Sequence, residues 1–473
     1  MSVQPLEFFG RVDKALIDEQ LRKAVPFTQD RLRDGRFQAA NELGNVEEWR
    51  NLAAQIRMHT IENLDSYLEQ LTDNVVQNGG HVHFASTAED AVAHVLRITK
   101  ENNARSIIKS KSMVSEEIHL NKHLESEGLR VIESDLGEYI IQLAGETPSH
   151  LIAPAIHKTR AQVAELFSDV AGRPLSDETT ELCQFAREEL RREFLEADIG
   201  ISGCNFAVAE SGSVVLISNE GNARLTTTLP KVHIAIMGME RLVPTWEELD
   251  IVVSMLTRSA TGQKISVYMT AMSGPRRPQD IDGPEEFHLI VLDNGRSDIL
   301  GTAYQEVLKC IRCGACLNVC PVYRHIGGHA YGGVYSGPIG AVLTPLLEGY
   351  EEWKELPFAS SLCGACTEVC PVKIPLHDLL IEHRKDEVER GHASWQEKLA
   401  FKGFGYLTTH SSLYDKAVRA GHMATGWLAT DDVIEKGPGP LAGWTSVRDL
   451  PRPAKQSFRE WWKKEKEGGT HGN

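Results

Sequence analysis

The chain has 473 residues, of which 41% are hydrophobic and 25% are charged, and its 66 acidic against 50 basic residues give a formal net charge of −16. This length allows about two to four domains and a core large enough to need no disulfide bonds. The acidic balance argues against a protein that mainly binds nucleic acid or anionic lipid, because both partners require a surface rich in Lys and Arg.

The sequence gives no sign of export or of membrane insertion. Met1–Glu7 lacks the basic start and the apolar run of roughly 7–15 residues that a secretory signal requires. No stretch approaches the ~18 consecutive apolar residues of a transmembrane helix. We therefore expect a cytoplasmic protein without a transmembrane segment.

The first two of four segments differ in their apolar pattern. Residues 1–70 carry apolar positions three to five residues apart among helix formers, which predicts an N-terminal helical segment. In residues 71–296, short apolar runs alternate with longer amphipathic ones, which is typical of βαβ units. We expect an open α/β domain in this second segment.

Strands and helices are expected to alternate through the α/β domain. The strands are expected at residues 81–85, 106–109, 129–132, 233–237, 265–269 and 288–292, with a strand–turn–strand over residues 205–218. The helices are expected from a capping box at residues 86–89 to about residue 102, and at residues 115–127, 159–194 and 246–258.

The last two segments contain the cysteine motifs and a tail. Residues 297–385 are expected to form a helical ferredoxin-type domain around those motifs. Residues 386–473 are expected to form a C-terminal helical tail, which a Gly-Pro-Gly-Pro breaker at residues 437–440 interrupts.

Seven of the nine cysteines lie between Cys310 and Cys370. An odd number of cysteines in a reducing compartment argues against a disulfide framework. Cys310-x2-Cys313-x2-Cys316-x3-Cys320-Pro matches the ferredoxin run, in which three thiolates bind one cluster and the fourth binds another. This pattern predicts iron–sulfur clusters.

The cysteine motif is duplicated. Residues 313–322 and 363–372 are identical at eight of ten positions. Crossed ligation between the two copies predicts two [4Fe–4S] clusters. Their ligands would be Cys310, Cys313, Cys316 and Cys370 for the first cluster, and Cys320, Cys363 and Cys366 for the second.

The second cluster lacks one thiolate, because Ser360 stands three residues before Cys363. Three outcomes remain open: Ser360 coordinates iron after deprotonation, another group or solvent does so, or the site holds a three-iron cluster.

A pair of zinc sites is the alternative for the whole group of motif cysteines, but three successive cysteines at this spacing and a closing Cys-Pro disfavour it. For Cys183 and Cys204 we expect small buried side chains rather than redox roles.

Glu220 is the one candidate outside the cysteine region. It ends an expected strand beside Gly221-Asn222, where its carboxylate could act as a nucleophile or nearby N–H groups could bind an anion. A polar loop after a buried strand is an equally good interpretation. The sequence contains neither a P-loop nor a Gly-x-Gly-x-x-Gly after a strand, so it gives no sign of a nucleotide site.

Several stretches together resemble the lactate utilization protein B family: residues 203–213, 220–224 and 226–230, followed by the motifs at Cys310 and Cys363. The resemblance implies an α/β domain related to the CoA-transferase and ribose-phosphate isomerase fold, followed by a helical ferredoxin module. It also implies an iron–sulfur subunit that acts with lactate utilization proteins A and C in oxidising L-lactate to pyruvate.

We therefore expect an electron carrier that passes single electrons through two clusters to an unidentified acceptor, rather than the substrate-binding catalytic subunit. The sequence leaves the catalytic residues unknown, and no nucleic-acid partner is expected. One alternative is an acyl- or CoA-transfer enzyme that uses Glu220, with the clusters as a redox sensor. A second alternative makes the α/β domain a binding platform for partner proteins.

Overall fold

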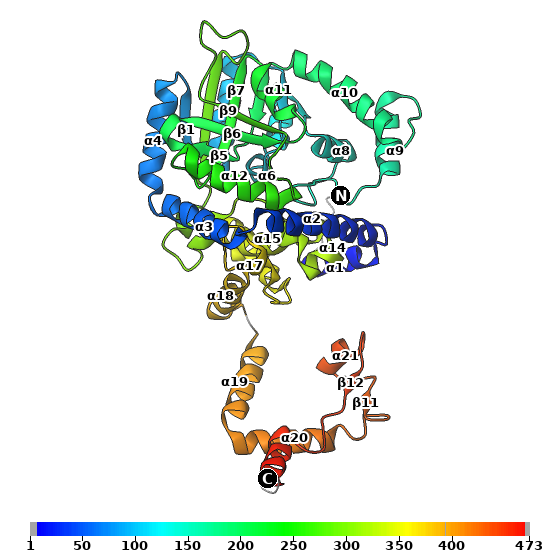
Figure 1. Ribbon diagram of the computed structural model, residues 1–473. Coiled ribbons are helices and arrows are strands. Elements are labelled where there is room, and N and C mark those ends of the chain that lie inside the picture. Colours follow the sequence, from blue (N-terminus) through cyan, green and yellow to red (C-terminus); the bar gives the residue numbers. More distant parts are fainter. Residues whose placement is uncertain (1–6, 393, 469–473) are drawn as a thin grey trace. The chain divides into compact units, whose positions relative to one another are not determined.

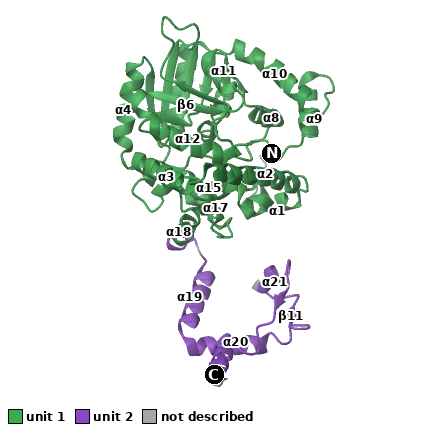
Figure 2. Cartoon of the chain, viewed as in Figure 1, with its two compact units in different colours: residues 1–386 green, residues 387–473 purple. Residues whose placement is uncertain are grey.

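The computed structural model describes residues 7–392 and 394–468. The chain divides into two compact units, Met1–Asp386 and Glu387–Asn473 (Figure 2). The prediction about export rests mostly on residues 1–6, which lie outside the described residues. No helix in the described ranges is long and apolar enough to cross a membrane.

The N-terminal segment is helical, as expected. Its helices are α1 (Phe8–Ile17), α2 (Leu21–Leu43), α3 (Val46–Glu62) and α4 (Leu64–Gln77). Helices α2 and α3 lie between the sheets and the cysteine region (Figure 1). Helix α2 contacts α12 (Trp246–Thr261) on one side, and α13 (Ala315–Asn318) and α14 (Pro321–Ile326) on the other. This segment therefore joins the two parts of the first unit.

The α/β domain is built on a six-stranded, fully parallel sheet, which confirms the mixed α/β class. In spatial order its strands are β1 (His81–Ala85), β10 (Glu286–Leu292), β7 (Val232–Gly238), β4 (Ile199–Ser202), β2 (Ser106–Lys109) and β3 (Arg130–Glu133). All seven residues of β7 are buried, as expected for a parallel strand covered on both faces. Strand β4 was not expected, because its sequence Ile-Gly-Ile-Ser contains a glycine, which weakens the strand pattern.

A second, four-stranded sheet runs in the order β8 (Leu242–Val243), β5 (Phe206–Val208), β6 (Ser213–Ser218) and β9 (Tyr268–Met272). Strands β5 and β6 confirm the expected strand–turn–strand, with Gly212 in the left-handed conformation at φ 66°. The strand expected at residues 265–269 begins three residues later, at Tyr268. It pairs with β6 and lies at the edge of this sheet.

The helices of the α/β domain are α5 (Ala88–Glu101), α6 (Met113–Glu117), α7 (Leu120–Ser126), α8 (Leu136–Ala144), α9 (Arg160–Ala171), α10 (Thr179–Glu196), α11 (Asn222–Thr228) and α12 (Trp246–Thr261). The capping box before α5 pairs Thr87 with Asp90, so the expected frame was wrong by one residue. The expected helix 115–127 breaks at His119, which has φ 48°. The expected helix 159–194 breaks after Gly172, and α8 was missed.

The cysteine region is made of short helices and turns: η2 (Ser297–Ile299), η3 (Gln305–Lys309), α13 (Ala315–Asn318), α14 (Pro321–Ile326), η4 (His329–Tyr331), α15 (Gly337–Glu348), α16 (Tyr350–Trp353), η5 (Leu356–Phe358), α17 (Ala365–Val369) and α18 (Leu376–Glu389). Helix α13 of the first motif contacts α17 of the second. The two sequence repeats are therefore neighbours in space.

The second unit contains α19 (Trp395–Thr409), α20 (Ser411–Ala424), α21 (Pro440–Thr445) and α22 (Phe458–Gly468), with a small antiparallel pair of β11 (Val433–Ile434) and β12 (Leu450–Pro451). The expected helices are present in this tail. Its side chains are mostly exposed.

Candidate functional site

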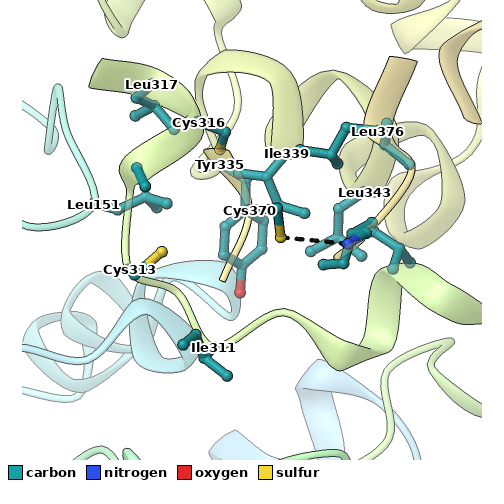
Figure 3. Packing of buried hydrophobic residues seen from close by; sticks show 14 of the residues in the cluster. Leu151, Ile311, Cys313, Cys316, Leu317, Tyr335, Ile339, Leu343, Cys370 and Leu376 are labelled. Carbon is teal, nitrogen blue, oxygen red and sulfur yellow. Dashed lines mark hydrogen bonds between the residues drawn. The ribbon is translucent and has the colours of Figure 1, made fainter. Parts of the chain in front are cut away.

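Four cysteines line one small apolar cavity. Cys310 follows η3, Cys313 and Cys316 lie at the start of α13, and Cys370 follows α17. Leu151 and Ile339 are among the apolar side chains that complete the lining. The sulfurs of Cys313, Cys316 and Cys370 lie among these side chains in Figure 3. The structure thus brings the last cysteine of the second motif to the first three cysteines of the first motif.

The other three motif cysteines form a second group. The thiol of Cys320 interacts electrostatically with that of Cys363, and the thiol of Cys366 interacts with both. Cys320 and Cys366 are buried, whereas Cys363 is exposed. Cys366 also interacts with Cys316 of the first group, so the two groups are adjacent.

Backbone N–H groups point at the sulfurs. The Arg312 N–H donates to Cys310 Sγ and the Ile374 N–H donates to Cys370 Sγ, each at 3.4 Å. The Tyr323 N–H lies 3.5 Å from Cys320 Sγ. Such bonds stabilise thiolate over thiol, and in iron–sulfur proteins they tune the reduction potential.

The motif thiols lie in surroundings that raise their pKa values. Burial, and then the nearby Cys370, raises the pKa of Cys313 to about 12. Burial, and then Cys320, raises the pKa of Cys366 to about 11. Free thiols in this setting hold their protons at neutral pH, and metal ligation replaces those protons. The donor set, with its N–H bonds and apolar lining, therefore fits iron–sulfur clusters.

Ser360 has the same local geometry as Cys310. Its Oγ accepts the N–H of Leu362, two residues on, at 3.1 Å, as Cys310 Sγ accepts the N–H of Arg312. Both donor residues have an unusual positive φ, 54° at Leu362 and 60° at Arg312. The hydroxyl of Ser360 thus occupies, in the second repeat, the place that the sulfur of Cys310 occupies in the first.

The N-terminal helices hold the ends of both motifs by hydrogen bonds to backbone carbonyls. Gln29 of α2 donates to Leu317 O at 2.6 Å, and Arg36 donates to Val369 O at 2.7 Å. Arg50 of α3 donates to Cys370 O at 2.9 Å. Sequence reasoning missed these residues, because polar side chains on a charged helix give no signal of a distant carbonyl partner.

Glu220 lies at a separate cavity at the carboxyl end of the parallel sheet. Its Oε2 accepts the N–H of Leu136 at 3.1 Å. Burial, and then Asp135, raises the pKa of Glu220 to about 7. The same cavity is lined by Lys111 and by Arg312 of the first cysteine motif. Glu220 therefore faces a pocket, although it is distant in sequence from the cysteines.

The remaining cysteines differ from each other. Cys183, on α10, is exposed, so the expectation of a buried side chain was wrong there. Cys204 is partly buried, and burial raises its pKa to about 12, which keeps the thiol protonated. In the ranges that the structure describes, no three His, Cys, Asp or Glu side chains converge on a single point as ligands of one metal ion.

Three family models match the chain. Residues 68–292 match the LUD domain, residues 306–374 match the 4Fe-4S dicluster domain, and residues 382–467 match the model described as lactate utilisation protein B, C-terminal. The second match agrees with the two groups of cysteines and supports iron–sulfur clusters.

Relatives match the chain over nearly its full length. The lactate utilization protein B of Shouchella clausii is 56% identical, covering 100% of this chain and 99% of that protein. The protein of the same name from Bacillus licheniformis is 55% identical, covering 98% and 97%. A solved structure of a DUF162 family protein from Deinococcus radiodurans matches with 17% identity and a TM-score of 0.28, covering 48% of this chain and 98% of that one.

The sequence resemblance, the three domain matches and the full-length relatives agree, and the chain belongs to the lactate utilization protein B family.

Proposed function

We propose that this protein is the iron–sulfur electron carrier of a system that oxidises L-lactate to pyruvate. The family name supports lactate utilization, and the dicluster match supports electron transfer. Oxidation of a 2-hydroxy acid to a 2-oxo acid releases two electrons and two protons. A pair of adjacent one-electron centres suits this stoichiometry.

The observation that carries the proposal is the crossing of the two motifs. Cys370 lies with the first three cysteines, and Cys320 lies with Cys363 and Cys366. In our proposal these groups hold one [4Fe–4S] cluster each, the second with Ser360 as its fourth ligand. The bound clusters would supply one-electron redox chemistry, while the chain fixes their ligands, N–H bonds and apolar surroundings.

Single cysteine variants test the crossing. Cys370→Ser is expected to damage the same cluster as Cys310→Ser, and Cys320→Ser the same cluster as Cys363→Ser, as measured by iron content and electron paramagnetic resonance of the reduced protein. Cys183→Ser, at an exposed cysteine outside the motifs, is the matched control and should keep both signals. If Cys370→Ser instead paired with Cys363→Ser, each motif would bind its own cluster and the ligand assignment would be wrong.

Lactate utilization proteins A and C remain the proposed partners, together with an acceptor that is still to be identified. Co-purification of the full chain with each tagged partner under anaerobic conditions tests this. The acidic net charge of −16 leads us to expect that no nucleic acid co-purifies.

The relation of the α/β domain to the CoA-transferase fold also remains a proposal. A CoA-transferase fold would suit the alternative function, which is acyl or CoA transfer through Glu220. The position of the Glu220 carboxylate at a cavity favours this alternative. Glu220→Gln separates the two functions. If the variant keeps its clusters and its full activity in lactate oxidation, Glu220 does not act as a nucleophile in that reaction.

A further inference from the structure

The cavity beside Glu220 shares a wall with the first cysteine group. It has a volume of about 270 Å³ and is lined by residues that follow β2, β4 and β6, and by Arg241 and Arg312. Arg241 also donates to Cys310 O at 2.7 Å. Drug-sized ligands need roughly 300–1,000 Å³, so this cavity suits a small molecule. The carboxyl edge of a parallel sheet is a general ligand position.

Two cations of this lining carry nitrogen atoms without hydrogen-bond partners. Both Nε and Nη1 of Arg312 are buried without a partner, and so is Nζ of Lys111. The nearest acid to Lys111 is Glu138, at 3.7 Å, which is an ion pair without hydrogen-bond contact. Buried donors without partners are costly, and a bound acceptor would satisfy them.

The Arg312 guanidinium is held in place before any ligand arrives. Its third nitrogen, Nη2, lies 3.2 Å from Glu240 Oε1, and its plane lies over the ring of Tyr335 at 4.3 Å. Because Cδ lies between Nε and Nη1, these two nitrogens donate in different directions, and each offers its own N–H to an anionic oxygen. The free nitrogens of Arg312 are therefore preorganised donors.

The other charges of the lining are already engaged. Arg241 is bound to carbonyl oxygens, and Asp135 accepts the N–H groups of Gly137 and Glu138 as the cap of α8. Glu220, which accepts the Leu136 N–H, is the acid whose negative charge would repel an anion bound here. Its raised pKa of about 7 lowers the fraction of Glu220 that is charged near neutral pH, and so weakens this repulsion. The unpartnered groups are cationic, so the cavity favours an anion.

We propose that this cavity binds a small monocarboxylate of the 2-hydroxy or 2-oxo acid class, with the carboxylate on Arg312 and Lys111, beside the first cysteine group. That the cavity binds an anion follows from its geometry. That this anion is a 2-hydroxy or 2-oxo acid rests on the proposed function. The protein would then bind substrate or product as well as carry electrons.

Titration calorimetry on the anaerobic, iron-loaded full chain tests the proposal, with L-lactate and pyruvate as ligands and lactamide, acetate and inorganic phosphate as comparisons. We expect both acids to bind, lactamide to fail, and acetate and phosphate to bind more weakly. Lys111→Gln should weaken binding roughly 10- to 100-fold, as expected for loss of a charged hydrogen bond. Arg312→Gln should do the same wherever its iron content stays normal.

The matched control is Lys231→Gln. This exposed lysine precedes β7 and lies at the opposite, amino end of the sheet, so binding should be unchanged. Equal affinity in Lys111→Gln and Lys231→Gln, or phosphate binding as tight as that of lactate, would overturn the site. Normal iron content without any binding would overturn the site and leave the electron carrier standing, whereas absence of iron would remove the carrier itself.

Discussion

At the scale of single residues, Ser360 would decide the chemistry of the proposed second cluster. A serine hydroxyl is a weaker iron ligand than a thiolate, and Ser360 already has the backbone geometry of Cys310. Ser360→Cys should therefore give eight irons per chain and slow the loss of the second cluster in air, whereas Ser360→Ala should speed it. Both effects are measured by the decay of visible absorbance. Equal decay in wild type and both variants would show that Ser360 does not reach iron.

His150 makes the stability of the protein depend on pH. Its Nδ1 accepts the Ile152 N–H at 3.0 Å and its Nε2 lies 3.1 Å from Asn318 Oδ1, so the ring is neutral in the fold. Burial, and then Lys111, lowers its pKa from 6.5 to about 4. On acidification, His150 therefore takes up a proton at a higher pH in the unfolded chain than in the folded one. The free energy of unfolding falls as the pH drops from about 6.5 to about 4.

For a shift of this size, the loss of folding free energy at pH 5.5 relative to pH 8 is on the order of 1 kcal/mol. Urea unfolding of wild type and His150→Gln at both pH values measures it. The variant should lose less stability on acidification by about that amount. An identical loss in both proteins would mean that His150 titrates normally in the fold.

At the scale of elements, a buried ion network ties α6 and the β7–β8 turn to the cysteine region. Arg296 pairs with Glu117 and with Glu240 Oε2, each at 2.8 Å, and Tyr335 donates to Glu117 at 2.6 Å. Arg312 reaches Glu240 from the first motif. These contacts place the cavity wall against the sheet.

Removing one charge from this network should be expensive, because it leaves a buried partner uncompensated. Glu117→Gln is expected to lower the free energy of unfolding by about 3–5 kcal/mol, as measured by urea unfolding at neutral pH. Glu125→Gln, at an exposed position on α7, should change it by less than about 0.5 kcal/mol. A similar small change in both variants would contradict a structural role for the network.

The elements that could be predicted from the sequence are those with a strong local signal. Strands β7 and β10 are long apolar runs, and β5 and β6 flank a glycine turn, so their positions agree with expectation. Strand β4 contains a glycine and β8 has only two residues, so neither has a strong strand pattern of its own. Likewise, the helix break at His119 lies at a residue that is not a helix breaker, although its backbone is left-handed.

At the scale of the whole molecule, the candidate site joins parts that are far apart in sequence. The spacing of the cysteines is a local property of the sequence, so it could predict which cysteines form each of the two groups. The carbonyl contacts of Gln29 and Arg36, and the cavity that Lys111 shares with Arg312, join residues about 200 or more positions apart. Such long-range partners leave no pattern in a single sequence.

Two adjacent clusters held by crossed motifs are the central claim, and analysis of the anaerobically purified full chain tests them most directly. Iron and sulfide determination with Mössbauer spectroscopy should give eight irons per chain, matching sulfide, and two distinguishable clusters. Stoichiometric zinc with little iron, or a single cluster of four irons, would contradict the account.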